Sequence, residues 1–218
     1  MNVKYKYKLF GRFKGRKKNN QSSLLNLTRY NVNFDTNINI NKYNILDIGS
    51  GSGENAIYLS NLYPKANIIA CELFHDGNLN LCNKIYTKKI TNIFLFNGNV
   101  LEFLDNMDKE LIFNEIWILF PDPWPKIRHQ KRRLINYSFL KKLHFYLKNN
   151  GQLSIASDSH SYIHAILRLI DENRNLFLWQ NQSFEKWNYN NLDLPATKFS
   201  KKAIKTNRKS IFFKLNKI

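Results

Sequence analysis

Residues 44–53 read Asn-Ile-Leu-Asp-Ile-Gly-Ser-Gly-Ser-Gly, in which a short apolar run passes directly into three alternating glycines. The run 44–48 predicts a β-strand, and the apolar spacing of residues 54–62 predicts a helix. A glycine turn between a strand and a helix lets a ligand approach backbone amides that side chains would otherwise cover. This stretch therefore predicts the first strand, turn and helix of an α/β domain, although an ordinary βα turn without a ligand has the same local pattern.

Strand-like and helix-like segments alternate along the chain after this turn. We expect further parallel strands at 67–71, 92–96, 115–120 and 152–156, and further helices at 79–86, 100–104, 136–147 and 162–170, with a turn at 149–151. Segments 176–179 and 209–215 are expected to add antiparallel strands at one edge. Such alternation predicts an α/β fold with a mostly parallel, doubly wound sheet and helices on both faces.

The distribution of charge indicates a polyanionic partner. The chain has 34 Lys and Arg against 16 Asp and Glu, a net charge of +18 and a pI of about 9.9. Residues 1–34 contain nine basic and no acidic residues, residues 126–133 contain five basic residues, and residues 198–218 contain eight, whereas 35–125 is acidic on balance. A Lys-rich genome would have spread the charge evenly, so the segregation favours nucleic-acid binding. We expect a basic N-terminal arm at 1–34 and one domain at 35–218.

Several other classes of protein are disfavoured by composition. Two cysteines eleven residues apart, with no signal-like N-terminus, favour a reduced cytoplasmic compartment. No apolar run approaches the roughly 18 residues that a membrane helix requires. The five histidines show no ligand spacing with cysteine, so no metal is expected.

Polar residues at the ends of the predicted strands are candidates for binding a cofactor. Asp47 precedes the turn at Gly49 and Gly51, where a carboxylate suits the amine of an amino-acid-bearing cofactor better than a pyrophosphate. Glu72 ends the next strand, where it can accept hydrogen bonds from ribose hydroxyls, as it would for NAD as well. Asn99 follows the third strand and is either an adenine-binding residue or a plain turn residue.

The stretch 116–134, Ile-Trp-Ile-Leu-Phe-Pro-Asp-Pro-Trp-Pro-Lys-Ile-Arg-His-Gln-Lys-Arg-Arg-Leu, is the most informative. Its prolines stop the strand and stiffen the loop, so that Asp122 is held beside Trp124. Trp124 can stack on a base or close a pocket. The cations that follow can bind phosphates. This combination indicates an RNA-binding loop at a ligand site.

The chain resembles the bacterial single-subunit tRNA (guanine-N7)-methyltransferases. The resemblance rests on LFGRFKGR, DIGSGSG, CELFHDG, FPDPWPKIRHQKRRL, SDSHSY and LPATKFSKKAIKTNRKSIFFKL. It implies a Rossmann-like class I fold, S-adenosyl-L-methionine as cofactor, and methylation of guanine 46 of tRNA to 7-methylguanosine. It also implies that Asp47, Gly49, Gly51, Glu72, Asn99 and Asp122 line the cofactor site, that Lys126, Asp158, Thr197, Lys198, Phe199 and Ser200 face the substrate, and that Arg128, His129, Lys131, Arg132 and Arg133 meet RNA.

Three positions depart from the family pattern. Asp47 stands where Glu is common and Asn99 where Asp is common, and both changes keep hydrogen-bonding ability. Ser200 stands where Glu is usual, and a hydroxyl replaces a carboxylate as an acceptor only in part. The substrate role of Ser200 is therefore the expectation with least support.

Two acidic residues have an expected part in the reaction. Guanine N7 has an unshared electron pair and no proton, so Asp122 is expected to be catalytic only by orienting the reactants and stabilising the positive charge on the product. Asp158 can accept from N1–H and the exocyclic amine of guanine together, which would select that base. Its alternative role is to cap the helix that follows.

Three other functions differ in what they would require. A non-catalytic RNA-binding protein would not need the cofactor residues, a small-molecule methyltransferase has no use for a charge of +18, and an NAD-dependent dehydrogenase fits poorly with Asp47 and the glycine spacing. We expect tRNA as the partner, no membrane association, no obligate protein partner, and a monomer or homodimer.

Overall fold

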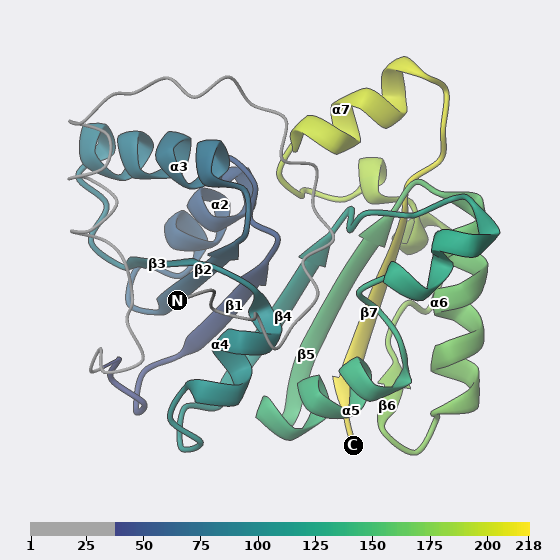
Figure 1. The fold of residues 1–218 in the computed structure, drawn as a ribbon, viewed down its shortest axis with the longest axis horizontal. Coiled ribbons are helices and arrows are strands. Elements are labelled where there is room, and N and C mark those ends of the chain that lie inside the picture. Colours follow the sequence, from purple (N-terminus) through teal and green to yellow (C-terminus); the bar gives the residue numbers. More distant parts are fainter. Residues whose placement is uncertain (1–37) are drawn as a thin grey trace, which may run out of the picture.

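Residues 38–218 are described by a computed structural model, and the basic arm predicted at 1–34 lies outside them. A seven-stranded sheet runs through the domain in the order β3-β2-β1-β4-β5-β7-β6 (Figure 1). The strands are β1 (Asn44–Ile48), β2 (Asn67–Glu72), β3 (Ile93–Asn97), β4 (Phe113–Leu119), β5 (Leu147–Ser157), β6 (Phe177–Trp179) and β7 (Ile211–Lys217). The first five pair in parallel, while β7 pairs antiparallel with both β5 and β6. The predicted parallel sheet with an antiparallel edge is confirmed.

Helices cover both faces of the sheet (Figure 1). On one face, α2 (Glu54–Leu62) and α3 (His75–Lys88) pack with the strands through Leu59 and Leu81. On the other, α4 (Val100–Asn106), α5 (Tyr137–Tyr146) and α6 (His160–Glu172) bury an apolar stripe that includes Phe103, Leu143 and Ile166. Each stripe follows helical periodicity, so burial of these side chains holds the helices against the sheet.

The predicted turn at 149–151 is corrected by the structure. Residues 149–151 lie inside β5, which pairs with β4 at Leu147, skips several residues, and pairs again from Gln152. Asn150 takes the left-handed conformation at φ 60°, which accommodates the extra residues as a bulge. The strand therefore begins five residues earlier than the sequence suggested, and α5 ends before it at Tyr146.

The strand order indicates at which edge of the sheet a ligand binds. The order reverses between β1 and β4, and ligands of such sheets bind beyond the carboxyl ends of the strands at that switch point. The short helix α7 (Lys198–Lys205) lies at that end of the sheet, near the tips of β4 and β5 (Figure 1). Three 3-10 turns complete the described chain: η1 (Ile127–Arg132), η2 (Phe184–Trp187) and η3 (Tyr189–Asn191). Across residues 38–218, no helix is both long and apolar enough to cross a membrane.

Candidate active site

The glycine turn after β1 is fixed by hydrogen bonds to the end of β2. Gly49, Gly51 and Gly53 have φ values of 72°, 56° and 81°, a left-handed region that glycine adopts without steric cost. The Gly49 amide donates to the carbonyl of Cys71 at 2.8 Å, and the Gly51 amide donates to Oε2 of Glu72 at 2.8 Å. The turn and the carboxylate predicted from sequence are thus brought together at one edge of the sheet.

Asp47 is a buried carboxylate with an unused acceptor. Its side chain is 1% exposed, and Oδ1 accepts a hydrogen bond from Nδ2 of Asn55 at 2.9 Å. Oδ2 has no hydrogen-bond partner among the described residues, and neither has the buried hydroxyl of Ser50 in the same turn. Burial is the main cause that raises the pKa of Asp47 to about 7. The charges of Glu72 and Glu54 add to it, while the Asn55 hydrogen bond and the Ala56 amide oppose it.

These unsatisfied groups provide a test of whether an amino-acid-bearing cofactor fits. A buried carboxylate oxygen without a donor is costly, and an ammonium group would supply both the positive charge and the hydrogen bonds that it lacks. Glu72 already accepts from the Gly51 amide and, at 2.7 Å through Oε1, from the Phe74 amide, so its carboxylate is held at the edge of the turn. The residues present therefore fit a ligand that carries an ammonium and a ribose.

Asn99 has a structural role at the end of β3. It is the N-cap of α4, and its Oδ1 accepts a hydrogen bond from the Leu101 amide at 2.9 Å. This is the turn role that was left open for it. Its amide group remains a candidate for contact with an adenine edge.

Helix α3 packs directly on the glycine turn at Gly77, a contact that no local sequence pattern indicates. A Cβ at Gly77 would lie 2.6 Å from the carbonyl oxygen of Gly51, closer than real Cβ atoms approach backbone. Replacing Gly77 with alanine should therefore displace the turn, and we expect cofactor affinity to fall about tenfold, measured by calorimetric titration. The higher helix propensity of alanine would by itself raise the free energy of unfolding by about 1 kcal/mol. Asn80→Ala, at an exposed position of the same helix, should leave affinity unchanged.

The loop after β4 begins with a strained backbone and continues as a cationic 3-10 turn. Phe120 and Trp124 have φ values of 55° and 42°, which are unusual for bulky residues. The guanidinium of Arg132 lies 5.0 Å from the centre of the Trp124 ring, and His129 meets the same ring edge-on at 5.8 Å. Asp122 is exposed, and burial raises the pKa of Tyr162, with the charge of Asp122 adding to it. The loop thus presents a carboxylate two residues from an aromatic ring that Arg132 and His129 already contact.

Arg133, which sequence reasoning assigned to RNA, is turned inward. Only 8% of the residue is exposed. Its Nε donates to the carbonyl of Pro123 at 2.9 Å, Nη2 donates to Oγ of Ser161 at 2.9 Å, and the guanidinium lies 4.8 Å from the Tyr162 ring centre. Arg133 therefore ties the loop after β4 to the first turn of α6, and a buried guanidinium with these partners is not placed to bind phosphate.

The other basic residues of this loop face outward. Arg128 and Lys131 on η1 and Lys126 just before it are exposed, so their charges are accessible to a polyanion. Desolvation and the neighbouring positive charges lower the pKa of His129. The loop therefore keeps a cationic outer surface although Arg133 is not part of it.

Asp158, beyond β5, is paired with a residue near the C-terminus. Its Oδ2 accepts from Nη2 of Arg208 at 2.9 Å, and its side chain is 18% exposed. The N-cap of α6 is Ser159, so Asp158 does not take the capping role left open for it. The ion pair with Arg208 holds the carboxylate at the edge of the sheet. Arg208 could not be predicted from the sequence, because no local pattern marks a contact across 50 positions of the chain.

The segment before α7 uses its hydroxyls internally. Thr197 is the N-cap of α7, and its Oγ1 accepts from the Ser200 amide at 3.0 Å. The Ser200 hydroxyl donates to the Thr197 carbonyl at 3.0 Å, and both residues are buried. Lys198 and Phe199 are exposed on the same turn. Lys198 and Phe199 are therefore accessible from solvent, while Thr197 and Ser200 support the start of the helix.

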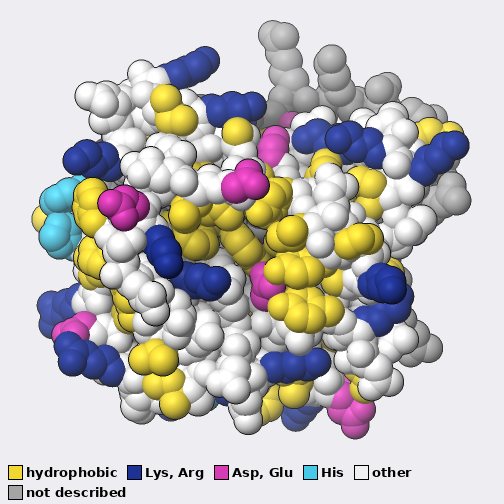
Figure 2. Space-filling model, turned by 180° about the vertical axis from the view of Figure 1, so that it is seen from behind, with side chains coloured by type: hydrophobic (Ala, Val, Ile, Leu, Met, Phe, Trp, Pro, Cys, Tyr) yellow, Lys and Arg dark blue, Asp and Glu magenta, His cyan; other side chains and the backbone are white. Residues whose placement is uncertain are grey.

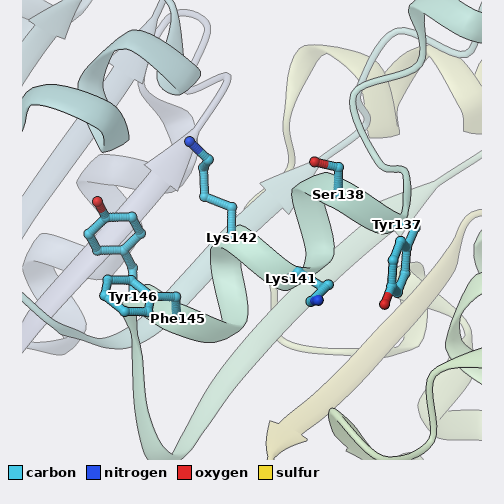
Figure 3. Close-up of a pocket in the computed structure, with 6 residues that line it drawn as sticks. All are labelled: Tyr137, Ser138, Lys141, Lys142, Phe145 and Tyr146. Carbon is cyan, nitrogen blue, oxygen red and sulfur yellow. The ribbon is translucent and has the colours of Figure 1, made fainter.

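A surface depression of about 550 Å³ lies elsewhere, along α5. Figure 3 shows its six lining residues, with Tyr137 at one end of the helix and Phe145 and Tyr146 at the other. None of the sequence-predicted site residues belongs to it. We place the ligand site at the carboxyl edge of the sheet instead, where the glycine turn and the acidic side chains meet.

On the back of the molecule, Figure 2 shows hydrophobic side chains gathered around a central hollow with basic side chains at its margins.

The topology, the glycine turn and the acidic residues at the carboxyl ends of β1 and β2 define a Rossmann-like class I methyltransferase fold. Solved structures support the fold: an aminoglycoside resistance methyltransferase, NpmB1, covers 82% of this chain and 90% of its own at a TM-score of 0.57 and 14% identity. A structure described as a putative methyltransferase from Streptococcus mutans in complex with SAH covers 90% of this chain and 96% of its own, at a TM-score of 0.54 and 13% identity.

Sequence comparisons identify the family. The family model described as "Putative methyltransferase" matches residues 41–213. A tRNA (guanine-N(7)-)-methyltransferase of Wolbachia pipientis is 33% identical over 181 residues, which cover 83% of this chain and 78% of that protein. A bifunctional methyltransferase of Rickettsia felis is 37% identical over 163 residues, 75% of this chain but 30% of that protein, so the chain spans about a third of its length. The chain belongs to the tRNA (guanine-N7)-methyltransferase family.

Proposed function

We propose that this protein transfers a methyl group from S-adenosyl-L-methionine to N7 of a guanine in tRNA, giving 7-methylguanosine at guanine 46 of the variable loop. The observation that carries the proposal is the 33% identity over 181 residues to a tRNA (guanine-N(7)-)-methyltransferase, together with a methyltransferase family match over residues 41–213 that includes the glycine turn, the Pro-Asp-Pro-Trp loop and Asp158. A net charge of +18 supports a polyanionic substrate. We expect the enzyme to act in the cytoplasm, without an obligate protein partner, as a monomer or homodimer.

The cofactor would be held by the edge that joins β1 and β2. Asp47 would pair with the ammonium group through its unused Oδ2, and Glu72 would accept from the ribose hydroxyls beside Gly49 and Gly51. Asn99 would meet the adenine. When bound, S-adenosyl-L-methionine supplies an electrophilic methyl group that guanine N7 can accept through its unshared electron pair, with no proton to remove.

The substrate would be held by the loop after β4 and by the end of β5. Asp122 would stabilise the positive charge that develops on the guanine, since a fixed carboxylate near a forming cation needs no reorganisation during the reaction. Lys126 would contact guanine O6 or a phosphate, and the exposed Lys198 and Phe199 of α7 would also face the substrate. Thr197 and Ser200 would act by positioning these two residues. The exposed cations Arg128 and Lys131 would bind the tRNA backbone, with the half-buried Arg132 and His129 beside them at the Trp124 ring.

Asp158 has a defined task in this proposal. Arg208 occupies one of its carboxylate oxygens, and the carboxylate would accept from N1–H and the exocyclic amine of the target guanine. Replacing Asp158 with asparagine puts a donor where an acceptor is needed, so we expect kcat/KM for tRNA to fall about 100-fold, the value of roughly 1.5–3 kcal/mol for a charged hydrogen bond. The affinity for the cofactor should stay unchanged. A parallel loss of cofactor affinity would contradict this role.

The proposal is tested by transfer of a labelled methyl group to unmodified tRNA transcripts. We expect label in a transcript with guanine at position 46 and none when adenine replaces it. Label in both transcripts would reject the position but keep the enzyme class. Label in neither, with cofactor bound, would reject tRNA as the substrate.

A further inference from the structure

Two histidines lie side by side on the exposed surface of α6. His160 and His164 are four residues apart, one helical turn, so both rings project from the same side of the helix. Their Nε2 atoms are 3.3 Å apart, and their ring centres are 4.5 Å apart. Both residues are exposed. In Figure 2, histidine side chains gather at one margin of the molecule.

The distance between the two nitrogens matches the bite of a tetrahedral metal ion. Zinc binds histidine nitrogen at about 2.0–2.1 Å, so two nitrogens at a tetrahedral angle are separated by about 3.3–3.4 Å. Square-planar or octahedral ions, with ligands at right angles, would bring them to about 2.9 Å. A hydrogen bond between two rings would also favour a shorter distance. We propose that His160 and His164 form a two-ligand zinc site on the surface of α6.

The rest of the coordination shell would be water. Within residues 38–218, no group of three or more His, Cys, Asp and Glu side chains converges on one point, so no third protein ligand is at hand. The nearby carboxylate of Asp158 is paired with Arg208, and that of Glu172 with Arg168. Two coordination positions of the zinc ion are therefore left for water. The site would bind zinc more weakly than a four-ligand structural site and would exchange the ion with solvent.

Zinc at this site would link the first two turns of α6 and stabilise them. Ser159 at the N-cap makes no side-chain hydrogen bond to the helix, so the helix start lacks that stabilisation. The same turn carries Ser161, which accepts from Arg133 and thereby holds the loop after β4. A metal bridge from His160 to His164 would fix this anchor, because both ligands must be helical to reach one ion. Occupancy by zinc would thus stabilise the helix that supports the RNA-binding loop.

The test is titration of the tag-free, full-length protein with zinc chloride, followed by calorimetry and by thermal unfolding. We expect one zinc ion to bind and to raise Tm by about 2–4 °C. His160→Asn and His164→Asn should each lower zinc affinity at least tenfold and remove the shift in Tm. His75→Asn, on a separate helix, should keep both. Cys71 and Cys82 are buried, so they do not compete.

Further measurements exclude an indirect effect of the substitutions. Without zinc, each histidine variant should unfold at the Tm of the parent protein, so that a lost shift reports lost binding. Cobalt(II) in place of zinc should give the intense visible absorption of a tetrahedral site. Wild-type protein that binds no zinc, or His164→Asn protein that keeps wild-type affinity, would overturn the proposal.

Discussion

Asp47→Asn protein is expected to be more stable than the parent at pH 8 and to bind the cofactor about 100-fold more weakly. The raised pKa means that the buried carboxylate disfavours folding once it ionises. The pKa of this carboxyl moves from 3.8 to about 7 on folding. Its contribution to the free energy of unfolding is therefore fully present below pH 4 and is lost as pH rises through 7, by about 4 kcal/mol in all. An asparagine avoids the charge but leaves a buried amide unpaired, which costs about 1–3 kcal/mol.

The free energy of unfolding of the Asp47→Asn variant, measured by urea denaturation, should therefore exceed that of the parent by about 2 kcal/mol at pH 8. This difference should vanish near pH 5. Loss of cofactor affinity follows from removing one partner of a buried ion pair, about 2–5 kcal/mol. In the parent protein, cofactor affinity should also rise between pH 6 and 8 as Asp47 ionises, and the asparagine variant should lose this pH dependence. A variant with unchanged affinity and a retained pH profile would remove Asp47 from the site.

Glu115→Gln is the matched control. Glu115 is also buried, but its two oxygens accept hydrogen bonds from the Tyr43 hydroxyl and the Trp117 indole, each at 2.8 Å. It lies toward the other end of the sheet, in β4 opposite Ile45. We expect its substitution to lower the free energy of unfolding, because a donor replaces a satisfied acceptor, without changing cofactor affinity.

The kcat of Arg133→Ala protein is expected to fall at least about 100-fold, because a displacement of about 1 Å at a reacting group can cost this much. The salt dependence of tRNA binding should stay near that of the parent. Arg133 ties the carbonyl of Pro123 to Ser161, so its loss frees the loop that carries Asp122. We also expect a loss of about 2–4 kcal/mol in stability, because buried acceptors lose a charged donor.

Lys131→Ala separates this effect from a loss of RNA contact. Lys131 is exposed on the same loop, so its removal should weaken tRNA binding, lower the slope of log affinity against log salt by about 1, and leave kcat at saturating tRNA unchanged. The comparison needs tRNA affinity measured at several salt concentrations and single-turnover rates for both variants. If Arg133→Ala lowers the salt slope as Lys131→Ala does and keeps its kcat, Arg133 belongs to the RNA surface after all.

The parts of the site that sequence could predict are those that depend on local pattern. The glycine turn at 49–53 and the strand ends at Asp47 and Glu72 follow from strand, turn and helix in immediate succession, and the parallel fold brings such ends to one edge. The charge of the loop at 126–133 is also visible in the sequence, because it needs no partner to be recognised.

The parts that sequence could not predict depend on contacts across the chain. The cationic run includes Arg133, and only the packing of α6 against the loop shows that this one residue points inward to Ser161. The approach of Gly77 to the glycine turn and the pairing of Arg208 with Asp158 likewise arise from tertiary packing. The bulge in β5 was missed because its residues have turn-like composition inside a longer strand.

The most direct measurement is chemical mapping of the methyl group. Unmodified tRNA would be incubated with the protein and S-adenosyl-L-methionine, then treated with borohydride and aniline, which cleave the chain at 7-methylguanosine. We expect cleavage at a single site, guanine 46, that requires the cofactor and is lost with Asp122→Ala. Methyl label in the RNA without cleavage would contradict transfer to N7.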